Sequence, residues 1–241
     1  MLSQYTLTFQ TECPAPRQEW AYPLYASLLE RLPASVGIRQ HDGERTGVSQ
    51  FVRCVGDGRL VWQVSLLGEE AEEIFAPILE KMDCCTLRRE HATLRLQQRR
   101  VLRISGVEEL LSRPYPARRQ LRFVTPTAFK SRKAYDVLPT PERIMQSLIR
   151  RWNVCIPQCP IEDEDGEGTA MLARDLRCCG LQLRDCGYSL KGQVIPGTVG
   201  TMTLENRHSG FTAQLAHGLL TFASFSGVGI KTTLGMGGVL E

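Results

Sequence analysis

Apolar residues in the first hundred positions follow two spacings, one typical of strands and one typical of helices. They alternate with polar residues over 2–11, which predicts a strand. Leucines recur every four residues over 19–32, which predicts a helix. Gly56-Asp57-Gly58 is a strong hairpin signal between two further runs. The remaining expected elements are strands at 48–55 and 59–67, a helix at 69–82 and extended chain at 84–104.

The second half repeats this order. Thr140-Pro141 is a typical start for a helix, since proline suits the first turn. The expected elements are a strand within 117–130, a helix at 141–153, a hairpin of 178–191 with 198–206, an apolar helix at 212–225 and a short terminal strand. The β-α-β-β-α-β order thus occurs twice. It predicts an α+β fold of two tandem ferredoxin-like (RRM-like) domains, at 1–110 and 117–241.

Charge is distributed unevenly along the chain, although the net charge is only +3. Between Arg88 and Arg151 there are 16 Lys or Arg residues against 5 Asp or Glu. Most cations are arginines, whose planar fork pairs bidentately with phosphate. We therefore expect a nucleic-acid partner; the alternative is a set of solvated arginine-rich faces.

The composition also limits the compartment and the metal chemistry. No apolar stretch is long enough for a membrane span, and 1–12 lacks the features of a signal peptide. Nine cysteines without regular spacing are typical of reduced thiols, so we expect a cytoplasmic protein with no membrane partner. Five of them cluster at 155–186 without a C-x-x-C pair, and the acidic stretch 161–168 lacks calcium-loop spacing. We expect no metal.

The most specific local feature is the glycine-rich stretch 226–238, SGVGIKTTLGMGG. Glycine backbone can adopt positive φ, and successive amides in such a loop can bind phosphate oxygens. A nucleotide-binding P-loop is excluded, because the spacing is wrong and the helix precedes the loop. A purely structural turn is the alternative. The expected RNA-contacting residues here are Gly227, Gly229, Lys231, Thr232, Gly235, Gly237 and Gly238.

This stretch and LRFVTPTAFKSRK at 121–133 together resemble one family, the CRISPR-associated RAMP endoribonucleases that cut precursor CRISPR RNA within each repeat. Gly227-Val228-Gly229 and Gly235-Met236-Gly237 match the family's terminal G-h-G-x(5)-G-h-G run. The resemblance implies paired ferredoxin-like domains and metal-independent cleavage without a cofactor. A 2′-hydroxyl would attack the adjacent phosphate, giving 2′,3′-cyclic phosphate and 5′-hydroxyl ends.

The resemblance also implies a catalytic histidine in the loop after the first helix, which here is His41. An exposed loop histidine without a role is the alternative. Family members often carry a lysine nearby, but this chain has Arg45, which can stabilise charge and cannot act as a general acid. Tyr25 is a candidate to orient the 2′-hydroxyl, although it also borders the leucine stripe of that helix.

The expected partner is CRISPR repeat RNA, with other CRISPR effector-complex subunits as further candidates. The basic residues expected to bind the RNA are Arg119, Arg122, Lys130, Arg132, Lys133 and Lys191. The rival hypothesis is a RAMP-type subunit that binds CRISPR RNA in an effector complex without cutting it. A generic RRM is disfavoured, because the aromatic RNP motif is absent.

Overall fold

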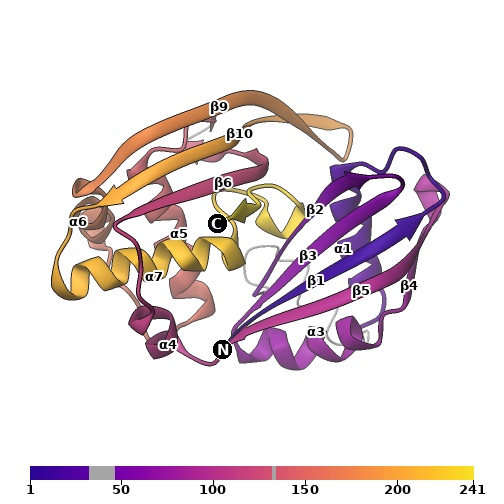
Figure 1. Cartoon of the computed structure of the whole chain (residues 1–241), viewed down its shortest axis with the longest axis horizontal. Helices are drawn as coiled ribbons and strands as arrows, with labels where there is room; N and C mark the ends of the chain where they lie inside the picture. Colours follow the sequence, from indigo (N-terminus) through magenta and orange to yellow (C-terminus); the bar gives the residue numbers. More distant parts are fainter. Residues whose placement is uncertain (33–46, 132–133) are drawn as a thin grey trace.

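The computed structural model describes residues 1–32, 47–131 and 134–241. Two antiparallel sheets, each backed by helices, lie next to one another, and both chain ends lie near the junction between them (Figure 1). Each half contains the order β-α-β-β-α-β with further short elements added, and its first strand lies in the interior of its main sheet. The predicted α+β fold of two tandem ferredoxin-like units is therefore confirmed.

The first sheet has the strand order β2-β3-β1-β5-β4. Positive φ at Gly56, Asp57 and Gly58 closes the predicted hairpin between β2 and β3. Helices α1 and α3 pack on one face of this sheet. The elements are β1 (Leu2–Thr11), η1 (Gln18–Trp20), α1 (Ala21–Leu29), β2 (Val48–Gly56), β3 (Arg59–Leu67), α3 (Glu69–Lys81), β4 (Cys84–Leu87), η3 (Arg88–Glu90) and β5 (Ala92–Ile104).

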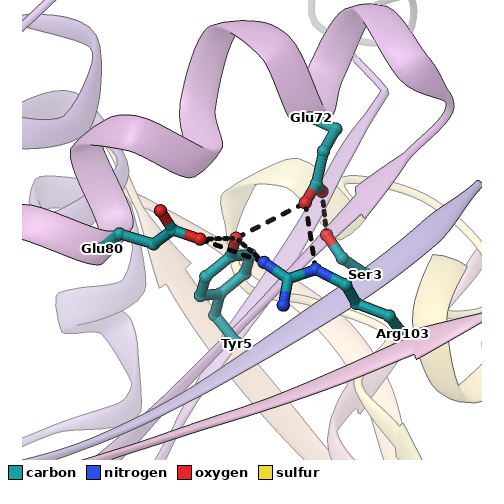
Figure 2. A network of polar contacts seen from close by, with 5 residues as sticks. All are labelled: Ser3, Tyr5, Glu72, Glu80 and Arg103. Atoms are coloured by element: carbon teal, nitrogen blue, oxygen red, sulfur yellow. Dashed lines mark hydrogen bonds and ion pairs between the residues drawn. The ribbon is translucent and has the colours of Figure 1, made fainter.

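A polar network fastens α3 to this sheet (Figure 2). Arg103 on β5 donates to the hydroxyl of Tyr5 at 3.1 Å and to Glu80 at 3.0 Å. Tyr5 donates to Glu80 at 3.2 Å, and Ser3 donates to Glu72. Burial, with the nearby carboxylates of Glu72 and Glu80, raises the pKa of Tyr5 to about 12. The hydroxyl therefore stays protonated at neutral pH and acts as a structural donor.

The second sheet has the strand order β11-β6-β10-β9. The side chain of Thr140 accepts a hydrogen bond from the amide of Arg143, as expected of an N-cap before Pro141. The core contains Trp152 and Phe222, whose rings meet edge to face. The elements are α4 (Val107–Ser112), β6 (Arg118–Thr127), β7 (Phe129–Ser131), β8 (Ala134–Asp136), α5 (Pro141–Cys155), η4 (Glu164–Gly166), α6 (Glu167–Arg174), β9 (Leu176–Leu190), β10 (Gln193–Asn206), α7 (Gly210–Ser226), η5 (Thr232–Leu234) and β11 (Val239–Leu240).

The pattern missed two helices, α4 and α6. α6 begins inside the stretch that was expected to be an acidic surface loop. There Asp163 accepts hydrogen bonds from the amide and the hydroxyl of Thr169, at 2.7 and 2.9 Å, which fixes the first turn. The expected extended chain at 84–104 is interrupted at η3, where His91 has a φ of 48°.

The two halves are joined through buried polar contacts as well as apolar packing. Gln50 on β2 donates to the carbonyl of Ala21 at 3.0 Å and to that of Thr233 in η5 at 2.9 Å. Gln4 on β1 donates to the carbonyl of Ser224 in α7 at 2.8 Å. Because these contacts come from both halves, the C-terminal segment is held against the first sheet.

Candidate functional site

The glycine-rich stretch leaves α7 and runs between the two sheets before it becomes β11 (Figure 1). Gly227, Gly229, Gly235 and Gly237 all have positive φ, between 68° and 104°. A Cβ at Gly229 would collide with the carbonyl oxygen of Ala128, and one at Gly237 with that of Val228. Glycine is therefore required at both positions by the protein's own backbone.

The amides of this stretch are mostly bonded within the protein. Gly229 donates to the hydroxyl of Ser147 at 2.8 Å, and Gly237 donates to the carbonyl of Pro126 at 3.0 Å. Gly238 donates to the hydroxyl of Thr125 at 2.8 Å. These bonds tie the stretch to β6 and α5, which favours the structural alternative for the glycines over a phosphate-binding nest.

The loop also carries the side chains expected to touch RNA. Lys231 is half-buried and has a φ of 55°, while Thr232 is buried. Gly235 is packed so closely that an added Cβ would meet the hydroxyl of Tyr188. Contact between Lys231 or Thr232 and RNA stays a prediction.

Arg119, unlike the other described cations expected to bind RNA, lies inside the protein. Its side chain is 6% exposed and points to the helix side of the second sheet. It donates to the carbonyl of His217 and the hydroxyl of Thr221, each at 2.8 Å, and forms an ion pair with Glu241. Because its donors are engaged inside the protein, this geometry speaks against a direct role in RNA binding.

The other cations expected to bind RNA are more accessible. Arg122 on β6 and Lys130 on β7 are exposed. Lys191 lies at the tip of the β9–β10 hairpin, with its ammonium 5.2 Å from the centre of the Tyr22 ring. This tip borders a cavity of about 240 Å³ that Arg17 also lines. Arg132 and Lys133 lie outside the described residues.

Of the three candidate catalytic residues, Tyr25 belongs to the described part of the chain. His41 and Arg45 lie outside the described residues. Tyr25 is 4% exposed and belongs to the core cluster of the first half. Its burial favours a packing role, and contact of its hydroxyl with a substrate stays a prediction.

Comparison with known proteins links this fold and its glycine run to one family. Residues 121–239, from β6 to β11, match the family described as CRISPR-associated endoribonuclease Cas6. This match, together with the relatives and solved structures that follow, supports a CRISPR-associated repeat-processing endoribonuclease. Curated Cas6 endoribonucleases from Mycobacterium tuberculosis and Streptococcus thermophilus are 26% and 25% identical to it. These alignments cover 99% and 93% of this chain, and 77% and 92% of the relatives.

Solved structures extend the similarity to the whole chain. Thermus thermophilus Cas6 has a TM-score of 0.74 and 27% identity, over 100% of this chain and 98% of its own. A Cas6 product complex has a TM-score of 0.79 and 28% identity over the same shares. The structural similarity to Cas6 therefore extends over both ferredoxin-like units of this chain.

Three histidines of the chain lie within the described residues. His217 is buried in α7 and stacks on Tyr115 at 5.0 Å, and burial, followed by the charge of Arg119, lowers its pKa. The Nε2 atom of His208 lies 2.9 Å from the carbonyl oxygen of Leu172. His91 is exposed at the η3 turn. The side chains of His208 and His217 thus contact other parts of the protein, which favours a structural role for both.

Sequence reasoning missed Arg53, a half-buried residue on β2. Burial and then the charge of Arg122 lower its pKa, so the two guanidinium groups are close enough to interact across the two halves. The basic segment identified from the sequence begins at Arg88, so Arg53 lies outside it. Residue alternation along 48–55 was the available signal, because it puts Arg53 on the same side of the strand as Phe51.

The described residues contain no group of three or more His, Cys, Asp or Glu side chains placed to hold a metal ion. Cys178 and Cys179 are exposed free thiols on β9, and Cys155 is buried. Within the same described ranges, every helix is too short or too polar to cross a membrane.

Proposed function

We propose that this chain binds CRISPR repeat RNA and cleaves precursor CRISPR RNA within the repeat. The observation that carries the proposal is similarity to an endoribonuclease family whose solved relatives match both halves of the chain. One of these relatives was solved as a product complex. Exposed cations such as Arg122, Lys130 and Lys191 supply the positive charge that a polyanion requires.

We further propose that cleavage needs neither a metal ion nor a cofactor. His41 would remove the proton from the 2′-hydroxyl, which attacks the neighbouring phosphate. The guanidinium of Arg45 would stabilise the negative charge that develops on the phosphate, since it keeps its proton throughout. As the bond from phosphorus to the 5′-oxygen breaks, a general acid would protonate the departing 5′-oxygen, so the products would be a 2′,3′-cyclic phosphate and a 5′-hydroxyl. Tyr25 would support this site from the core of the first half, where it is buried.

The His41→Ala variant tests this assignment. Loss of a general base should lower the single-turnover cleavage rate about 10²- to 10⁴-fold. RNA affinity should change little, because one neutral imidazole adds little beside the 16 basic residues between Arg88 and Arg151. The matched control is His91→Ala, at an exposed turn, which should cleave like the wild type. Equal rates for both variants would remove His41 from the mechanism.

The rival function is a Cas6-like subunit that binds CRISPR RNA in an effector complex without cutting it. The absence of a lysine near His41 favours this rival, because Arg45 cannot deliver a proton to the leaving oxygen. Tight binding of the cognate repeat by the wild type, without a cut under any tested condition, would support it. Association with other effector subunits would then be its expected role.

A further inference from the structure

β2 of the first sheet and β6 of the second are in contact, and Gly238 in the C-terminal segment packs against both. A Cβ added at Gly238 would lie 2.6 Å from the ring of Phe51 on β2. The carbonyl of Gly238 accepts from the amide of Val124, and its amide donates to the hydroxyl of Thr125, both at 2.8 Å. Gly238 therefore holds the two strands side by side.

An arginine from each strand lies next to this contact. Arg53 is two residues beyond Phe51 and shares its face of β2, because side chains alternate along a strand. Arg122 is two residues before Val124 and shares its face of β6, the face opposite the buried Leu121. The charge of Arg122 lowers the pKa of Arg53, after the larger effect of burial. Arg53 and Arg122 therefore lie on the strands that meet at this junction, and the charge of one acts on the other.

Neither arginine has a carboxylate partner among the described residues. The Nε atom of Arg53 is buried without a hydrogen-bond acceptor in that part of the chain. By contrast, Arg103 and Arg118 pair with Glu80 and Glu205, each at 3.0 Å. Two neighbouring, unpaired cations repel one another, and an unsatisfied buried donor destabilises the free protein. An anion bound by both guanidinium groups would offset the repulsion between them.

We propose that Arg53 and Arg122 together bind one backbone phosphate of the repeat RNA and so bridge the two ferredoxin-like units. The proposal rests on the proposed function, since it assumes that the ligand is RNA. A phosphodiester suits this place because its two free oxygens can accept from two planar guanidinium forks. Because the cations come from different units, RNA bound here would fix one unit relative to the other.

The salt dependence of RNA binding tests the shared phosphate. Arg53→Gln and Arg122→Gln should each weaken binding of cognate repeat RNA about tenfold or more and reduce the slope of log K against log salt by about 1. Because both hold the same phosphate, the double variant should also lose about 1, not 2. The control is Arg207→Gln, whose guanidinium pairs with Glu205 at 2.8 Å; it should keep the wild-type slope.

The thermal stability of the RNA-free protein separates a binding role from a structural one. Relief of repulsion should leave the Tm of Arg122→Gln equal to or above that of the wild type. Retained affinity and slope in both single variants, or a marked fall in Tm with an unchanged slope, would overturn the shared phosphate site. A slope loss of about 2 in the double variant would show two separate phosphates. If the wild type fails to bind repeat RNA, the proposed function falls as well.

Discussion

Arg119 and Arg122 lie three residues apart on β6, but their surroundings are opposite. Arg119 faces the helices, where Thr221 and Glu241 occupy its donors. Arg122 is exposed on the other face, near a second cation, Arg53. The same residue type thus stabilises the fold on one face and offers free charge on the other. Local charge density therefore does not identify a binding surface until the face of each side chain is known.

The glycine-rich stretch belongs with the structural side of this comparison. Gly229→Ala and Gly237→Ala should lower the free energy of unfolding by about 2–4 kcal/mol, because each Cβ would meet a backbone carbonyl at positive φ. Chemical denaturation measures this loss. RNA affinity at a temperature where the variant is folded should change less.

The matched control for the glycines is Gly192→Ala at the hairpin tip. Its φ is 79°, but nothing lies within 4 Å of the added Cβ. It carries the backbone strain without the collision, so its loss should be about 1 kcal/mol. If all three variants lose the same stability, the close contacts of Gly229 and Gly237 are unimportant.

The next largest loss of stability is expected for Arg119→Met. It leaves the carbonyl of His217 and the carboxylate of Glu241 without their donor, so stability should fall by about 1–3 kcal/mol. The salt slope of RNA binding should stay at the wild-type value, in contrast to Arg122→Gln. A reduced slope in Arg119→Met would place this guanidinium on the RNA surface and break the distinction between the two faces.

The sequence was sufficient to predict which face of the strand carries Arg119. It was not sufficient to predict the contacts of the glycine-rich stretch. Alternation predicted the strands, and it also puts Arg119 on the same face as the buried Leu121 and Phe123. The partners of the glycine amides were not predictable, because Ser147 and Pro126 are distant in sequence and meet the loop only in the folded chain. The proximity of Arg53 to Arg122 was hidden for the same reason.

The smallest expected effect concerns pH on the helix side of the second sheet. Burial, followed by the charge of Arg119, lowers the pKa of His217 in the folded protein below its unfolded value. The folded state thus favours the neutral ring, so this contribution is present above the unfolded pKa and is lost as the pH falls below it. His217→Gln should show a shallower fall in Tm between about pH 7 and 5. Parallel curves for variant and wild type would mean that His217 is not linked to stability.

We propose that this chain cuts repeat RNA through the 2′-hydroxyl of the RNA itself. The most direct measurement is incubation of the wild type with cognate repeat RNA in EDTA, with an RNA carrying a single 2′-deoxy substitution at the cut site as the control. We expect one cut with 2′,3′-cyclic phosphate and 5′-hydroxyl ends, whereas the deoxy-substituted RNA should stay intact and tightly bound. Cleavage of the deoxy-substituted RNA, or cleavage that EDTA abolishes, would contradict the proposal.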